Sequence, residues 1–231
     1  MRIAALVTVS LLAAGFTAGC SQHRGGQSGQ PPTSPPSSTA SSATAPPSSK
    51  PSAPAAAPRA GAPISDVIAW VEAGHPADQA NYHVATRDGA TTQLGGDIAL
   101  SANAGQVSCM TDAKHTGGAL ACLVQLTSPP PRPVTAYGDW QGGWVDFDGT
   151  HLQVGSSRAD PGPFINGNGP ELADGSSLSF GDYRCRAGQA GLFCVNYAHQ
   201  SAVRFASAGI QPFGCLRSAP PPDGVGIAFS C

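Results

Sequence analysis

The chain has few charged residues and few aromatic residues. Lys, Arg, Asp and Glu together make up 11% of its 231 residues, aromatic residues make up 6%, and the formal net charge is −2. A nearly neutral chain lacks the basic surface that attracts nucleic acid or an anionic membrane. We therefore expect no nucleic-acid partner.

The common catalytic and cofactor motifs are also missing. The sequence contains no GxSxG, no HExxH, no Walker loop and no GxGxxG that opens a helix. No two cysteines have the CxxC spacing of a structural zinc site or a redox pair, and the six histidines show no tight metal-ligand spacing. We expect no catalytic residue, no metal and no cofactor.

Long apolar runs are absent except at the start, MRIAALVTVSLLAAGFTAGC. The apolar part, residues 3–16, has the length of a signal peptide and is short for a spanning helix. Small residues then lead to Cys20, as in a bacterial lipobox, so we predict a lipoprotein signal peptide over residues 1–20 with a diacylglyceryl anchor on Cys20. The alternative is an ordinary signal peptide in which Cys20 is incidental. In both cases we expect an exported protein. With the lipid, it is held on the extracytoplasmic side of the cell membrane, from which a part of it could be released.

Residues 21–62 consist mainly of Ser, Pro, Ala, Thr and Gly, and they include no aromatic residue. Such a segment cannot bury enough apolar surface to offset the entropy cost of ordering it. We predict a disordered linker that holds a folded domain away from the membrane.

Residues 63–231 are predicted to form a single β-rich domain. One segment, ISDVIAWVEAG, has helix signals, with Ser65 as the N-cap and Gly74 as the stop. The rest consists of short strand-like runs separated by turn signals such as Asp88-Gly89 and Asp148-Gly149. We expect strands over 82–87, 97–102, 106–111, 119–127, 143–147, 150–154, 177–186, 192–197, 202–205 and 225–230.

This pattern favours an all-β fold: a disulfide-stapled antiparallel sandwich or barrel with one short N-terminal helix. Two segments, GQVSCMTDAKHTGGALACLV and GDYRCRAGQAGLFCVN, repeat one plan, in which a cysteine stands on each side of a Gly-bearing turn. Both are predicted to be hairpins with facing cysteines.

The chain has seven cysteines. In an exported protein, an odd number leaves one cysteine without a disulfide partner in the chain, and this cysteine is expected to have another role. With Cys20 acylated, six remain, and an oxidising compartment favours disulfides between them. Six cysteines allow 15 connectivities. Nearest-neighbour pairing predicts Cys109–Cys122, Cys185–Cys194 and Cys215–Cys231.

The order SANAGQVSC…ACLV, SPPPRP, DGSSLSFGDYRC…GLFCVN resembles a family of small secreted actinobacterial proteins of uncharacterised function, over roughly residues 98–217. The family has a further cysteine pair between the two hairpins, whereas residues 135–169 of this chain contain no cysteine. The resemblance implies an actinobacterial, mycobacterial-type envelope lipoprotein and implies no catalysis.

The stretch DWQGGWVDFDG offers the best candidate for a binding site. Trp140 and Trp144 could stack on a sugar ring while Asp146 binds its hydroxyls; the alternative is that Trp144 and Phe147 build the core and Trp140 covers its edge. Asp139 and Asp146 could also serve as a catalytic carboxylate pair if they faced each other across a cleft.

Three functions follow from these features. The first is a lipid-anchored, non-enzymatic envelope module that binds an unknown protein, glycan or lipid. The second is a carboxylate-dependent hydrolase that acts on envelope glycans. The third is an inhibitor or adhesin directed at host proteins.

Overall fold

A computed structural model of the chain describes residues 56–158 and 161–231. These residues belong to one compact unit, Ser49–Cys231. The predicted signal peptide, Cys20 and the linker up to residue 55 lie outside the described residues. No helix in the described part of the chain is long and apolar enough to cross a membrane.

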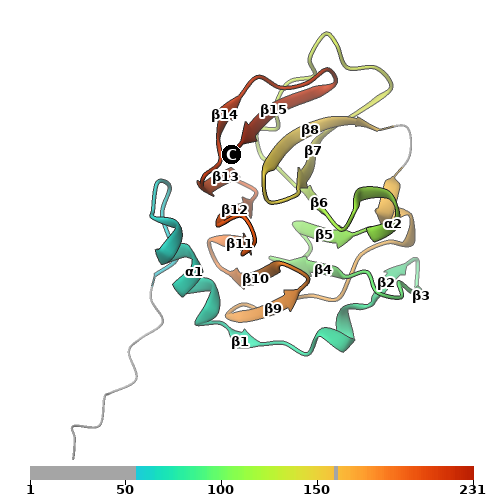
Figure 1. The fold of residues 1–231 in the computed structure, drawn as a ribbon. Helices are drawn as coiled ribbons and strands as arrows, with labels where there is room; N and C mark the ends of the chain where they lie inside the picture. Colours follow the sequence, from blue (N-terminus) through green and yellow to red (C-terminus); the bar gives the residue numbers. More distant parts are fainter. Residues whose placement is uncertain (1–55, 159–160) are drawn as a thin grey trace, which may run out of the picture. The chain divides into compact units, whose positions relative to one another are not determined.

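The domain is mostly β structure, as the sequence predicts (Figure 1). One large sheet has the strand order β1-β9-β10-β11-β12-β13. All of its neighbours are antiparallel except the short pair β1 and β9. Its strands are β1 (His75–Pro76), β9 (Ser176–Phe180), β10 (Tyr183–Gly188), β11 (Gly191–Asn196), β12 (Ser201–Ala206) and β13 (Gly209–Gly214).

The second large sheet is antiparallel throughout, with the order β14-β15-β8-β7-β6-β5-β4. A separate hairpin, β2-β3, forms a third sheet. The strands are β2 (Val84–Arg87), β3 (Ala90–Gln93), β4 (Ala99–Ala102), β5 (Val107–Thr111), β6 (Leu120–Val124), β7 (Asp139–Phe147), β8 (His151–Arg158), β14 (Arg217–Ala219) and β15 (Val225–Ser230).

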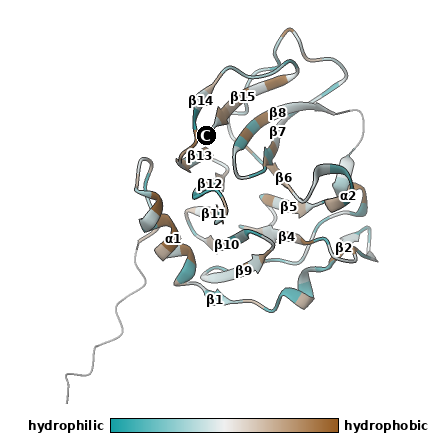
Figure 2. Ribbon diagram, viewed as in Figure 1, coloured by the Kyte–Doolittle hydropathy of each residue, from teal (hydrophilic) through white to brown (hydrophobic). Residues whose placement is uncertain are grey.

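The two large sheets share one apolar core and form a sandwich-like arrangement, with no closed barrel among the described strands. Leu100 and Leu120 from one sheet and Leu178 and Leu192 from the other are fully buried in this core. Strands β4 and β11 are buried on both faces, because other elements cover the outer sides of the sheets. Figure 2 shows apolar residues on α1 and on strands such as β5 and β15.

Helix α1 (Ile64–Glu72) confirms the predicted N-terminal helix and packs on the outer face of the first sheet. Val67, Trp70 and Val71 are its buried residues. The guanidinium of Arg186 on β10 lies 4.1 Å from the centre of the Trp70 ring and donates a hydrogen bond to the Trp70 carbonyl oxygen. A cation at the carboxyl end of a helix also suits the helix dipole, so Arg186 helps to dock α1.

The predicted N-cap was wrong. The helix begins at Ile64 with Pro63 as its N-cap residue and no side-chain cap, while Ser65 lies inside the first turn. Ala57 and Ala62, which fall within the predicted linker, pack against the apolar cluster under α1.

Several strands and short helices also differ from those that the sequence predicts. Residues 177–186 form two strands, β9 and β10, because Gly181 and Asp182 turn the chain between them. Strand β13 was missed because it contains Pro212, which is tolerated on this edge strand. Short helices were also missed: α2 (Ala113–Thr116), η1 (Gln79–Tyr82) and η2 (Gly162–Asn166).

The three disulfides join the predicted cysteine pairs. Cys109 faces Cys122 across β5 and β6, and Cys185 faces Cys194 across β10 and β11. All four of these cysteines are fully buried in the shared core. The two repeated segments are thus hairpins that carry one buried bridge each.

Candidate functional site

Turns from both large sheets meet at one end of the sandwich and enclose a cavity of about 330 Å³, which we call the turn-end cleft. One wall comes from the segment before β4 and the β5–β6 and β7–β8 connections; the other comes from the β9–β10 and β11–β12 turns. The lining residues are Gln79, Gly96, Asp97, Ile98, Thr111, Ala113, Thr116, Gly117, Gly118, Ala119, Asp148, Phe180, Gly181, Asp182, Tyr183, Asn196 and His199.

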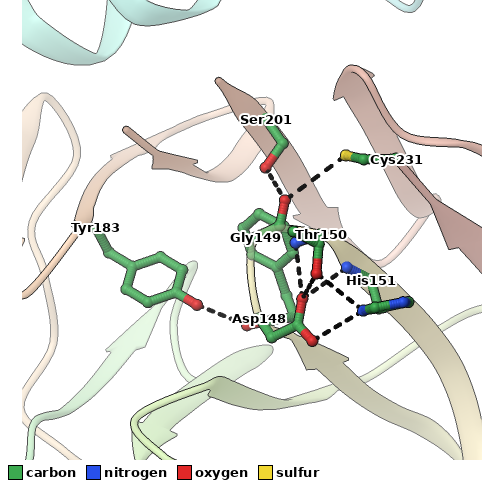
Figure 3. A network of polar contacts seen from close by, with 8 residues as sticks. Asp148, Gly149, Thr150, His151, Tyr183, Ser201 and Cys231 are labelled. Atoms are coloured by element: carbon green, nitrogen blue, oxygen red, sulfur yellow. Dashed lines mark hydrogen bonds and ion pairs between the residues drawn. The ribbon is translucent and has the colours of Figure 1, made fainter. Parts of the chain in front are cut away.

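Asp148 stabilises the β7–β8 turn at the edge of the cleft (Figure 3). Its Oδ1 accepts hydrogen bonds from the backbone N–H groups of Thr150 (2.7 Å) and His151 (2.6 Å), and Thr150 Oγ1 lies 2.9 Å away. His151 Nδ1 lies 3.1 Å from Oδ2. Burial alone would raise the pKa of Asp148, but the hydrogen bonds from the His151 and Thr150 amides outweigh it and lower the pKa. This carboxylate is a charged structural acceptor and not an acid that could donate a proton.

Tyr183 joins the two sheets at the floor of the cleft. Its hydroxyl donates a hydrogen bond to the carbonyl oxygen of Phe147 at 2.9 Å, across the sandwich (Figure 3). Its ring stacks on Phe180, with the ring centres 5.7 Å apart. Burial raises the pKa of Tyr183 to about 12, so this hydroxyl stays protonated near neutral pH.

Gly149 brings the β7–β8 turn into direct contact with the β11–β12 turn. It has a φ of +97°, and a Cβ placed there would lie 2.6 Å from Asn196 Cγ and 2.7 Å from His199 Cδ2. Ser201 Oγ donates to the Gly149 carbonyl oxygen at 2.5 Å, and Asn196 Oδ1 accepts from the His199 N–H at 3.1 Å. The absence of a side chain at Gly149 is what permits this close approach.

The third disulfide lies at the same end. Cys215 lies in the short connection between β13 of one sheet and β14 of the other, and Cys231 follows β15, so the Cys215–Cys231 bridge ties this connection to the end of β15. The Cys231 N–H donates to the Thr150 carbonyl oxygen at 2.9 Å. The Cys231 sulfur lies 3.8 Å from the Gly149 carbonyl oxygen, and the Cys215 sulfur lies 3.6 Å from that of His199. The bridge therefore touches both turns that close the cleft.

Asp97, in the segment before β4, organises the wall that this segment forms with the β5–β6 connection. Its Oδ1 accepts hydrogen bonds from Thr111 Oγ1 at 3.0 Å and from the Ala113 N–H at 2.8 Å. The lining as a whole contains three aspartates and no lysine or arginine. The cleft is consequently rich in hydrogen-bonding groups and negatively charged.

The structure places Trp144 inside the protein, as the core alternative predicts. The side chain is 3% exposed and packs edge-on against Phe164, with the ring centres 5.3 Å apart. Its indole N–H donates to Asp146 Oδ1 at 2.9 Å. The buried Trp144 cannot stack on a sugar ring, and the Asp146 carboxylate accepts the hydrogen bond of its indole. These two residues therefore do not form the predicted sugar site.

Trp140 is half-buried near the start of β7, a central strand of the second sheet. Its ring lies over Gly155, where a Cβ would approach Trp140 Cζ2 to 2.6 Å and Pro130 Cγ to 2.9 Å. Trp140 therefore covers the edge of the core together with the proline-rich β6–β7 loop.

Asp139 and Asp146 do not form a catalytic pair. On the neighbouring strand they face Arg158 and Gln153, which are five residues apart, or about 16 Å at the strand rise. The carboxyl groups of a glycosidase lie about 5–9.5 Å apart. In the part of the chain that the structure describes, no group of three or more His, Cys, Asp or Glu side chains could hold a metal ion.

Comparisons with protein-family models, with curated proteins and with solved structures found no significant match to this chain. The candidate site thus depends on the geometry of the turn-end cleft alone. Sequence reasoning missed Tyr183, Asn196, His199 and Asp97 as site residues. The available signal was their position next to turns, because turns at one end of antiparallel strands gather together.

Proposed function

We propose that this chain is an exported envelope lipoprotein, anchored through Cys20, whose β domain binds a neutral, hydroxyl-rich ligand such as a glycan in the turn-end cleft. The observation that carries the binding role is the lining of that cleft. The exposed carboxylate, amide and imidazole groups of Asp182, Gln79 and His199 line it, and no Lys or Arg side chain does. The cavity volume also falls at the lower end of the range for small-ligand sites.

The chemistry of the lining selects among the ligands that the sequence leaves open. A phosphate or carboxylate ligand would face three aspartates with no Lys or Arg to neutralise it. An acyl chain would have to displace water from polar groups that it cannot hydrogen-bond. Sugar hydroxyls can donate to carboxylates and accept from amides, so a neutral glycan suits the cleft best.

A binding role is preferred to hydrolysis because the carboxylate pair that the sequence predicts, Asp139 and Asp146, is not formed. Asp139 and Asp146 are too far apart along β7, and Asp148 is already hydrogen-bonded on both oxygens. Among the carboxyl groups whose pKa shifts, Asp112 and Asp148, both shift downward, which is the wrong direction for a general acid.

Titration of the full chain in detergent micelles tests the binding role. The probes are a neutral tetrasaccharide, the same tetrasaccharide with uronic acid units, and phosphatidylglycerol vesicles. We expect amide NMR shifts around the β9–β10 and β11–β12 turns with the neutral sugar only. Shifts with the acidic sugar or the vesicles alone would contradict the proposed ligand class.

Asp182 and Asp174 provide a matched pair of variants, since both are exposed aspartates and they flank opposite ends of β9. Asp182 lines the cleft and Asp174 does not. Loss of one hydrogen bond should weaken binding by about 2- to 13-fold in Asp182→Ala. Asp174→Ala should bind like the parent chain; equal losses in both variants would refute the site.

Cell fractionation tests the anchor. The parent chain should be found with the membrane and should incorporate a clickable fatty acid, whereas Cys20→Ser should be released and unlabelled. Ser21→Ala is the control and should behave like the parent. A Cys20→Ser chain that stays in the membrane fraction would remove the lipid anchor from the proposal.

One observation favours the adhesin or inhibitor alternative. Val134 and Tyr137 on the β6–β7 loop are 104% and 94% exposed, which is unusual for residues of this size. An aromatic side chain on a proline-rich loop is suited to protein contact. Capture of a host protein by the parent chain, lost in Tyr137→Ser and kept in Asp182→Ala, would support this second function.

A further inference from the structure

The three disulfides differ in exposure and in what they connect. The cysteines of the two hairpin bridges are fully buried in the core, and each bridge joins neighbouring strands of one sheet. Cys231 is exposed and Cys215 is half-buried, and their bridge ties the β13–β14 connection to the end of β15. A reductant can therefore reach the third bridge without opening the core.

We propose that the Cys215–Cys231 disulfide is a redox-sensitive cross-link that controls the shape of the turn-end cleft. This regulation rests on the proposed binding function of the cleft. The partner reductant is a dithiol, either a small molecule or a dithiol protein of the envelope, and it acts on this bridge while the two hairpin bridges stay closed.

The reaction is a thiol–disulfide exchange in two steps. A thiolate of the dithiol attacks one sulfur of the bridge, which breaks the S–S bond and releases the other cysteine as a thiolate. The second thiolate of the dithiol then displaces the remaining cysteine from the mixed disulfide. The reductant loses two electrons and becomes a disulfide, and its two protons end on Cys215 and Cys231 as thiols.

The contacts around the bridge explain how reduction reaches the cleft. The disulfide holds Cys231 against Thr150 and Gly149 of the β7–β8 turn (Figure 3). It also holds Cys215 against His199 of the β11–β12 turn. These two turns carry cleft residues on opposite walls. When the bridge opens, the covalent link between Cys231 and the β13–β14 connection is lost, and hydrogen bonds and packing alone hold the end of β15 against the two turns.

The rest of the fold does not depend on this bridge. Strand β15 remains paired with β8 from Val225 to Ser230, and the hairpin bridges remain in the core. Reduction should consequently loosen the turn end and leave both sheets intact. This separates a local switch from unfolding.

Graded reduction of the full chain tests the selectivity. The parent chain is treated with increasing dithiothreitol under native conditions, free thiols are alkylated, and each cysteine peptide is quantified by mass spectrometry. We expect Cys215 and Cys231 to be alkylated about 100-fold faster than the four buried cysteines, which must wait for core opening. Simultaneous release of all six thiols, or earlier release at Cys185 or Cys194, would overturn the proposal.

Hydrogen exchange of the same samples tests the link to the cleft. After selective reduction, the amides of Thr150, His151 and His199 should lose about 10-fold or more of their protection, while those of β10 and β11 keep theirs. The variant Cys215→Ser/Cys231→Ser should reproduce this pattern without reductant. Unchanged protection at the two turns would refute regulation of the cleft even if the bridge opens selectively.

Sugar binding gives the separate readout for the proposed function. If the parent chain binds the neutral tetrasaccharide, the reduced chain and the double serine variant should bind it at least about 5-fold more weakly. Binding that is equal in all three samples would refute the regulation. If the parent chain binds no sugar but reduction is selective and loosens both turns, the ligand class is wrong while the redox-sensitive cross-link stands.

Discussion

Replacement of Gly149 by alanine tests whether the two turns really depend on close contact. An added Cβ would lie 2.6 Å from Asn196 Cγ and 2.7 Å from His199 Cδ2, and real Cβ atoms do not approach side chains this closely. Asn196 is 2% exposed, and its Oδ1 accepts the His199 N–H. The asparagine therefore cannot turn aside without losing a buried hydrogen bond.

Two effects should add in this variant. A non-glycine residue held at positive φ costs about 1–3 kcal/mol, and overpacking a filled site costs about 1–3 kcal/mol more. Gly175 provides the matched control, because it has a φ of +84° but open space around its Cβ position. Gly175→Ala should show only the backbone cost, so the difference between the variants isolates the contact between the turns.

Urea unfolding of the non-reduced full chain, followed by circular dichroism, measures the difference. Both variants should keep the m-value of the parent, and Gly149→Ala should unfold at the lower urea concentration. A contact worth about 1–3 kcal/mol corresponds to a Tm about 2–12 °C lower than that of Gly175→Ala. Equal midpoints for the two variants would show that the added Cβ at residue 149 does not clash with the β11–β12 turn. The described close contact between the two turns would then be refuted.

Three further outcomes are expected. Burial raises the pKa of Tyr183 from 10.0 to about 12, so its contribution to stability is complete below pH 10. The free energy of unfolding should fall by about 2–3 kcal/mol as the pH rises from 10 to 12. The Tyr183→Phe variant should lack this component of the pH dependence. Trp144→Phe removes the bond to Asp146 and should lower the unfolding free energy by about 1–2 kcal/mol in a urea titration. Arg186→Ala removes the contacts with Trp70, and hydrogen exchange should show α1 amides losing protection worth about 2–4 kcal/mol while β11 keeps its own.

Local signals in the sequence were sufficient for the hairpins. Asp88 and Gly89 both have positive φ, at 51° and 81°, as their dipeptide suggests for a tight two-residue turn. The facing cysteines in the two repeated segments lie directly opposite each other, so spacing and turn residues together predicted the pairing. Each of these predictions depends on neighbours within about 20 residues.

The features that could not be predicted depend on distant segments. Pro212 hides a strand until it is known that β13 lies at the edge of its sheet, where the missing N–H costs little. The burial of Trp144 was undecided because its ring is covered by Phe164 of η2, a short helix that the sequence did not predict. The cleft itself draws on turns from five parts of the chain, and no single stretch carries its signature.

The distribution of cross-links suggests why a site can lie at this end of the domain. The hairpin bridges Cys109–Cys122 and Cys185–Cys194 lie in the shared core, so the core keeps two cross-links that do not involve the turn end. The turn end is then free to gather polar groups such as Asp97 and Asn196, which a core would not tolerate. Because the exposed bridge contacts both turns and lies outside the shared core, we expect a change in its redox state to alter recognition without endangering the fold.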